Sequence, residues 1–144
     1  MRSVCLALSL VVCAFAFAAC GDDDVDERVR CATCGMVVPE DSGWRAGGES
    51  LAFDAPKCLF RRIHREGSVE GAWVIEYYSQ ERAPAAELFY VIGSDLESPM
   101  GRDLVPVRGR EAAERLREDH HGEAVLSFDE VSAEIVEALF APRA

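Results

Sequence analysis

Residues 50–63 have the sequence SLAFDAPKCLFRRI, and this stretch carries the strongest structural signal in the chain. Residues 50–53 are mostly apolar and predict a short strand. Asp54 is a favourable helix N-cap, and Pro56 is tolerated in a first helical turn. The apolar side chains that follow recur at helical spacing, at Leu59, Phe60 and Ile63. The stretch therefore predicts a strand that leads directly into an amphipathic helix.

The rest of the chain alternates strand-like and helix-like segments. Aromatic and β-branched residues predict strands at 73–78, 87–92 and 124–128. A helix is expected around 111–119. The capping box Ser127-x-x-Glu130 predicts a last helix, whose apolar side is formed by Val131, Ile135, Val136 and Leu139. This order of elements predicts an α+β fold.

Two parts of the chain resemble each other weakly. Residues 51–54 and 126–129 each end a strand and start a helix, and residues 104–116 share the pattern of residues 51–63. Two similar small strand-and-helix halves would explain this. The alternative is that many strand-to-helix junctions look alike.

The length and charge of the chain limit its classes of partner. Its 144 residues suit one domain, or two very small ones that share a core. The 26 acidic residues outnumber the 15 basic ones and give a formal net charge of −11. Because phosphate binding needs clustered Lys and Arg, this charge argues against a nucleic-acid partner. It suits a basic protein partner.

The first residues predict an export signal. Arg2 supplies a positive charge, and the apolar run at 4–17 is shorter than the roughly 20 residues that a spanning helix needs. Ala18-Ala19-Cys20 then resembles a lipobox, the motif at which bacterial lipoproteins are cleaved and lipidated on the cysteine. Phe17 departs from the usual residue of that motif. The alternative is a weak membrane helix.

We therefore expect residues 1–19 to be a lipoprotein signal peptide and Cys20 to carry lipid. Residues 20–29 would form an acidic tether, since like charges extend a linker, and residues 30–144 the folded domain. The expected location is outside the cytoplasm. The lipid bilayer would hold the protein through Cys20, on the periplasm-facing side of a membrane or on the cell surface.

Three of the six cysteines remain for the folded domain. Cys5 and Cys13 leave with the signal peptide, and Cys20 is the expected lipidation site. The cysteines that remain are Cys31, Cys34 and Cys58. An odd number cannot all pair within the chain in an oxidising compartment. At least one thiol is therefore free or binds a metal.

The segment Cys31-Ala32-Thr33-Cys34-Gly35-Met36 permits three interpretations. With Cys58 and His64, the two cysteines would complete a zinc site. A redox pair usually lies at the start of a helix, but the residues after Cys34 predict none. A copper(I) site would gain Met36, because this soft ion prefers thiolate and thioether ligands.

Methionine is scarce after the expected cleavage site, where only Met36 and Met100 occur. Neither lies on an apolar helical stripe, and Met100 stands in the turn-like segment 97–101. The alternative for each is packing in the core, the commoner role of methionine. Their positions beside glycine and proline favour a ligand role.

Three motifs in order resemble the NosL family, the accessory lipoproteins of nitrous oxide reductase maturation. They are Cys31-x-x-Cys34-Gly35-Met36, then Leu51-Ala52-Phe53-Asp54-x-x-x-Cys58, then Ser98-Pro99-Met100-Gly101. The resemblance extends from the lipobox to about Leu139. Arg102-Asp103 departs from the small or apolar residue that is frequent after Pro-Met-Gly.

This resemblance implies a copper(I)-binding lipoprotein that delivers copper to nitrous oxide reductase or its assembly machinery, and no enzymatic activity. It also implies two similar α+β halves related to a domain of organomercurial lyase. The family's metal-binding Cys-Gly-Met and Pro-Met-Gly residues correspond to Cys34, Met36 and Met100, and its Phe-Asp-x-x-x-Cys element to Asp54 and Cys58.

We therefore expect a copper(I) site of Cys31, Cys34, Met36 and Met100. Asp54 is expected to cap a helix, and Cys58 to be a buried, inert thiol. The histidines at 64, 120 and 121 are expected to end helices rather than bind metal. The alternatives are delivery to another cuproenzyme, a membrane-anchored thiol–disulfide oxidoreductase using Cys31 and Cys34, and a zinc-stabilised domain.

Overall fold

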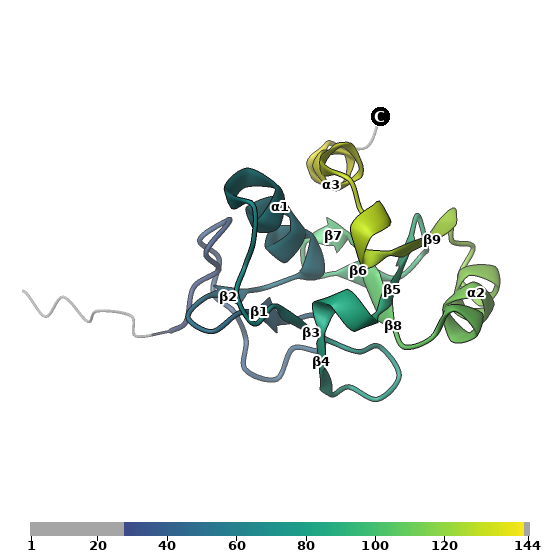
Figure 1. Ribbon diagram of the computed structural model, residues 1–144, viewed down its shortest axis with the longest axis horizontal. Helices are drawn as coiled ribbons and strands as arrows, with labels where there is room; N and C mark the ends of the chain where they lie inside the picture. Colours follow the sequence, from purple (N-terminus) through teal and green to yellow (C-terminus); the bar gives the residue numbers. More distant parts are fainter. Residues whose placement is uncertain (1–27, 143–144) are drawn as a thin grey trace, which may run out of the picture.

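The computed structural model describes residues 28–142, which form two small antiparallel sheets, a short hairpin and three α-helices (Figure 1). The first sheet has the order β2 (Ala52–Phe53), β1 (Ala46–Gly47), β3 (Trp73–Ile75), β4 (Arg82–Pro84). The second has the order β8 (Val105–Val107), β5 (Phe89–Ile92), β9 (Ala124–Ser127). The hairpin joins β6 (Glu97–Ser98) to β7 (Gly101–Arg102). The helices are α1 (Pro56–Glu66), α2 (Arg110–Asp119) and α3 (Ala133–Phe140), with 3₁₀ turns η1 (Ala85–Glu87) and η2 (Phe128–Glu130).

The α+β class predicted from the sequence is confirmed. In each sheet one strand leads into a helix, β2 into α1 and β8 into α2, at the two stretches whose patterns resemble each other. The predicted signal peptide, Cys20 and the tether up to residue 27 lie outside the described residues. Within residues 28–142, none of the helices has the length and apolar character that a membrane crossing requires.

The start of α1 differs from the prediction. Ala55, not Asp54, is the N-cap, and no side chain of the cap residue bonds the helix. The backbone amide of Lys57 instead donates to the carboxylate of Asp103, 46 positions away in sequence, at 2.8 Å. One of the amides that every helix start leaves unpaired is thus satisfied by a distant segment. Asp54 is free to turn towards Cys34.

Helix α1 lies where the two sheets meet. It packs against α3 and the first sheet, and Phe60 on α1 contacts Tyr90 of the second sheet edge-on, with ring centroids 4.8 Å apart. Its ring also lies 5.1 Å from that of Phe128. Such aromatic pairs contribute about 0.5–1.5 kcal/mol each beyond the burial of their area. One hydrophobic cluster therefore includes residues of both sheets.

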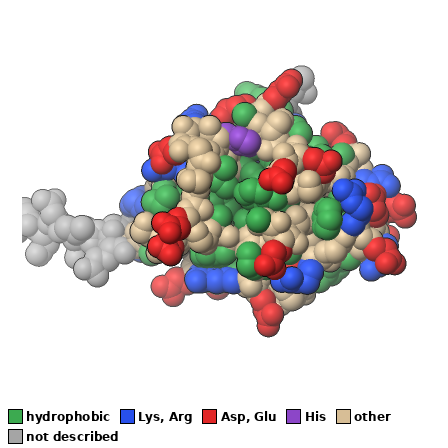
Figure 2. All heavy atoms as spheres, viewed as in Figure 1, with side chains coloured by type: hydrophobic (Ala, Val, Ile, Leu, Met, Phe, Trp, Pro, Cys, Tyr) green, Lys and Arg blue, Asp and Glu red, His purple; other side chains and the backbone are tan. Residues whose placement is uncertain are grey.

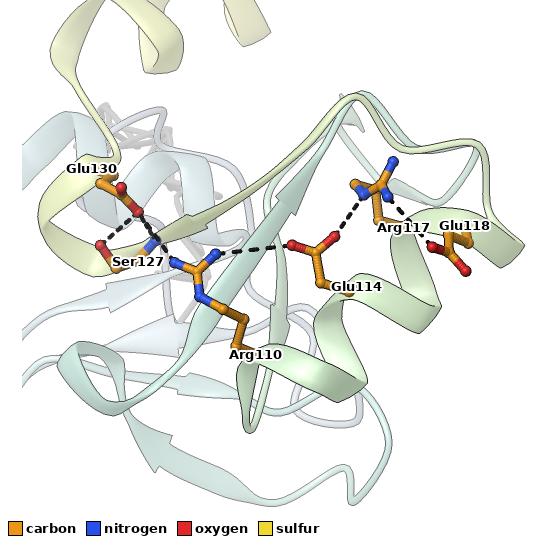
Figure 3. A network of polar contacts seen from close by, with 6 residues as sticks. All are labelled: Arg110, Glu114, Arg117, Glu118, Ser127 and Glu130. Atoms are coloured by element: carbon orange, nitrogen blue, oxygen red, sulfur yellow. Dashed lines mark hydrogen bonds and ion pairs between the residues drawn. The ribbon is translucent and has the colours of Figure 1, made fainter.

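Helix α2 covers the second sheet, on the right in Figure 1, above a separate apolar cluster. Charged side chains extend along its exposed face, where Arg110 lies between Glu114 and Glu130 and Arg117 between Glu114 and Glu118 (Figure 3). Such exposed ion pairs stabilise a fold by less than about 1 kcal/mol each. Packing of the apolar face, rather than these pairs, holds α2 in place.

Three predicted elements have different limits from those expected. The strand expected at 73–78 ends at Ile75, because the buried carboxylate of Glu76 accepts the amide of Ser79 and makes a turn. The strand expected at 87–92 begins at Phe89. The Ser127–Glu130 capping box forms, but it starts only the short η2. Helix α3 begins at Ala133, where the hydroxyl of Ser132 accepts the amide of Ile135.

Candidate metal site

The loop at residues 31–36 is closed by its own backbone. The amide of Cys31 donates to the carbonyl of Met36 at 2.8 Å, and the amide of Gly35 donates to the carbonyl of Cys31 at 2.9 Å. Gly35 has φ +77°, a conformation that costs glycine little and other residues more. Cys31 and Cys34 are thereby held in one tight turn. No helix begins there, which is unlike the usual setting of a redox pair.

Hydrogen bonds attach this loop to the strand and helix predicted from residues 50–63. The amide of Ala32 donates to the carbonyl of Ala52 at 2.9 Å, and the hydroxyl of Thr33 donates to the carbonyl of Cys58 at 2.8 Å. The variable residues of the C-x-x-C motif therefore place its two sulfurs beside the first turn of α1.

Four potential ligand atoms meet at this point. The sulfurs of Cys31, Cys34 and Cys58 and a carboxylate oxygen of Asp54 all lie within 4.8 Å of one another. All three thiols are free. Cys31, Cys58 and Asp54 are buried, while Cys34 is the most exposed of the four. We call these four residues the sulfur cluster.

The thioether of Met100 lies against the same cluster. Its sulfur is 3.8 Å from the sulfur of Cys58 and 3.9 Å from that of Cys34. Met100 belongs to the turn between β6 and β7, so it reaches the cluster from a segment 66 positions beyond Cys34. The fold thus gathers three thiols, a thioether and a carboxylate from three segments of the chain.

The thiols of the cluster differ in their acidity. The thiol of Cys58 donates to the sulfur of Cys31, and this bond lowers the pKa of Cys31 to about 6, against the opposing effect of burial. The same bond, together with burial, raises the pKa of Cys58. Partial burial, followed by smaller effects that include the charge of Cys31, raises the pKa of Cys34 to about 11. The bond from Cys58 therefore favours a thiolate on Cys31 and keeps the proton on Cys58.

The sequence-predicted ligands lie in two places. Cys31, Cys34 and Met100 come together at the cluster. The side chain of Met36 lies at the exposed rim of the loop, 48% accessible to solvent. The structure thus brings three of the four predicted residues into contact distance and leaves Met36 on the open side.

One interpretation made from the sequence is wrong, and a second is confirmed only for burial of the side chain. Asp54 does not cap α1, because its carboxylate lies 3.6 Å from the sulfur of Cys34. Cys58 is fully buried as expected, but its sulfur faces the cluster and Met100 rather than apolar side chains alone. The sequence signal that could have joined them is their spacing, since Asp54 lies just before the N-cap of α1 and Cys58 in its first turn.

The histidines lie elsewhere. The ring of His64 bonds the carbonyl of Val131 at 2.8 Å, and the ring of His120 bonds Asp95 at 2.9 Å. Among the described residues, the one group of close Cys, His, Asp or Glu side chains holds no histidine. The proposed zinc set of three cysteines with His64 is therefore not assembled. Thiolates and a thioether instead suit a soft metal ion.

Comparison with known proteins shows a similar fold and identifies the family. The fold is similar to the crystal structure of the copper chaperone NosL from Shewanella denitrificans, with a TM-score of 0.63 and 20% sequence identity. The similarity covers 76% of this chain and 94% of that one. No match was found among curated proteins. The sequence pattern that defines the NosL family matches residues 22–136, from the acidic tether into α3, and the chain belongs to the NosL family.

Proposed function

We propose that this protein is a copper(I) metallochaperone that delivers copper to nitrous oxide reductase while its metal centres are assembled. The observation that carries the proposal is the gathering of three cysteine sulfurs and the Met100 thioether within reach of one ion. A soft d¹⁰ cation prefers such ligands, whereas a carboxylate and histidine set would favour zinc. Copper is the cargo here, not a resident cofactor.

The differences in exposure suit transfer of the ion. Cys31 and Cys58 are buried and would hold copper from within. Cys34 and Met36 lie on the solvent side, where a ligand from a partner can approach. A thioether is neutral and needs no protonation to leave, so an incoming thiolate or imidazole can displace it. The buried sulfurs would thus retain the copper ion, while the solvent side of the site stays open to a ligand from the partner.

Asp54 has a separate role in this proposal. Its two carboxylate oxygens lie 3.6 Å from the sulfur of Cys34, which donates its proton towards them. Copper binding must expel the protons of thiol ligands, because the thiolate is the metal ligand. The Asp54 carboxylate accepts the hydrogen bond of the Cys34 thiol in the metal-free protein, and this bond would be given up when the sulfur binds the ion.

The choice of nitrous oxide reductase as client rests on family membership and on the description of the Shewanella denitrificans protein as a copper chaperone. Delivery to another cuproenzyme is the rival. The experiment mixes the copper-loaded protein with metal-free nitrous oxide reductase in the presence of a copper(I) chelator. Transfer of copper to the reductase is expected to be faster than its transfer from the copper–chelator complex alone. The visible absorption of the copper-loaded reductase measures the rate of this transfer.

The control for this transfer is a metal-free blue-copper protein offered under identical conditions. Equal rates of transfer to both acceptors would show that this chain is a general copper donor, and no transfer to the reductase would reject the proposed client.

We further propose that the protein acts outside the cytoplasm, attached to the bilayer through Cys20. The apolar run, the Ala18-Ala19-Cys20 ending and the acidic residues after it support this arrangement. An extended acidic tether would let the folded domain reach a partner away from the membrane surface. It would also keep an acidic protein from anionic headgroups.

A further inference from the structure

Lys57 is the one lysine in the sequence, and it is buried, with 1% of its surface exposed. Burial of an ammonium group is unfavourable unless hydrogen bonds replace the lost water. Here the ammonium nitrogen donates to the carbonyls of Met100 and Arg102, each at 2.8 Å. It also lies 5.1 Å from the centre of the Phe140 ring. The charge of Lys57 is thus satisfied mainly by the backbone of the β6–β7 hairpin.

A second contact joins α1 to the hairpin region, and here a side chain after the hairpin accepts a backbone amide of α1. Asp103, which follows the hairpin, is buried, and its Oδ1 accepts the amides of Lys57 at 2.8 Å and Leu104 at 2.9 Å. The side chain of Lys57 therefore holds the hairpin, and the residue after the hairpin holds the backbone of Lys57. This reciprocal contact fixes the first turn of α1 against the turn that carries Met100.

The turn itself is internally constrained. The hydroxyl of Ser98 accepts the amide of Met100 at 3.1 Å and donates to the carbonyl of Gly101 at 3.3 Å. Gly101 has φ +82°, which glycine adopts with little cost. These contacts fix the shape of the turn, and the bonds from Lys57 join the turn to α1.

Lys57 directly precedes a cysteine of the cluster, so its contact with the hairpin bears on the metal site. The next residue is Cys58, whose sulfur lies 3.8 Å from the sulfur of Met100. One helical turn therefore supplies both a thiol of the cluster and the ammonium group that holds the thioether beside it. A displacement of the Met100 carbonyl would change this sulfur–sulfur distance directly.

We propose that Lys57, together with Asp103, is a positioning residue that holds the Met100 thioether at the sulfur cluster for metal binding. The inference rests on the proposed function, because it assigns Met100 a place in copper(I) coordination. Lysine suits the role since its compact ammonium has three donors at the end of a slender chain, whereas arginine presents a wide planar fork.

The test is a double-mutant cycle on the full-length protein in detergent. Lys57→Leu keeps an apolar side chain at this buried position, removes the ammonium donors and adds no sulfur, and Met100→Leu removes the thioether with similar bulk. Lys57→Leu is expected to weaken copper(I) affinity by about 10- to 100-fold, the usual effect of losing a residue that orients a ligand. In the Met100→Leu background the same change is expected to weaken affinity by less than about threefold, because the two effects act through one sulfur.

A metal-independent measurement separates this inference from the proposed function. In protein labelled with ¹³C at the methionine methyl groups, Lys57→Leu is expected to shift the Met100 resonance and to leave that of Met36 in place. If the wild-type protein binds no copper(I), the proposed function fails, but the Met100 shift still tests the positioning role. An unchanged Met100 resonance would overturn the role of Lys57 even if copper binds.

Two further outcomes would overturn the inference. The first is an equal loss of affinity from Lys57→Leu in both backgrounds, which indicates a general effect on the fold, and the second is no loss in either background. If Lys57→Leu does not fold, Asp103→Asn provides the same cycle with little change of shape. Its loss of affinity is expected to disappear in the Met100→Leu background, and a loss that persists there, or no loss at all, contradicts the proposal.

Discussion

Replacement of Cys58 by serine is expected to weaken copper(I) binding by more than about 100-fold, beyond the range for residues that only orient a ligand. The sulfur of Cys58 belongs to the cluster and lies 3.8 Å from that of Met100. A serine hydroxyl is harder, remains protonated at neutral pH and is a poor ligand for a soft ion. The buried hydroxyl is also expected to destabilise the metal-free protein by about 1–3 kcal/mol.

The change in stability must be separated from the change in affinity. Ala83→Ser is a matched control, because it places a hydroxyl at another buried position, on β4 outside the cluster. It is expected to lower the free energy of unfolding in denaturant titrations without weakening copper binding. If Cys58→Ser and Ala83→Ser bind copper(I) equally well, Cys58 is an inert buried thiol and the site is smaller than proposed.

Replacement of Cys20 by serine is expected to move the protein from the membrane fraction to the soluble fraction, or to block its processing. Lipid attached to a cysteine anchors a chain through its buried methylenes, at about 0.8 kcal/mol each. Serine has no thiol to carry that lipid.

Fractionation followed by mass determination of the mature chain measures this effect. Cys13→Ser is the matched control, since that cysteine lies within the expected signal peptide and is lost on cleavage. It should leave both the processing and the membrane fraction unchanged. A Cys20→Ser protein that is processed and fractionates like wild type would replace the lipidation hypothesis with an ordinary signal peptide.

The helices were the most predictable part of the fold. Helices α1 and α2 carry clear apolar stripes, at Leu59 and Phe60 in one and Ala113 and Leu116 in the other, and both were found. The two-residue strands β1, β6 and β7 were not, because a strand so short cannot show an alternating pattern. Contacts with distant segments, rather than local sequence, form them.

In the candidate site too, local sequence patterns predict some residues, but contacts between distant segments cannot be predicted from them. The scarcity of methionine predicted that Met100 would join Cys34, and the fold brings their sulfurs to 3.9 Å. Asp54 was misassigned because an aspartate before a helix suits a cap, and the sequence does not show that Asp103 bonds the helix start instead. For Cys58, the apolar neighbours Leu59 and Phe60 predict burial, which is confirmed, but they do not show that its sulfur faces the cluster.

The surface adds one observation on how a partner meets the protein. On the face seen in Figure 2, apolar side chains occupy the middle of the view, and most acidic and basic side chains lie around its margin. The net charge is strongly acidic, which would favour approach of a basic partner at low salt. Transfer rates to a basic acceptor should accordingly fall as ionic strength rises.

The most direct measurement of the central claim is a metal titration of the purified, reduced protein against a copper(I) chelator and excess zinc. The thiols of Cys31, Cys34 and Cys58 with the Met100 thioether predict one copper(I) per chain, retained when zinc is added in excess. X-ray absorption of the loaded protein should show sulfur ligands. Stable retention of zinc against copper(I), or no tightly bound copper at all, would contradict the account.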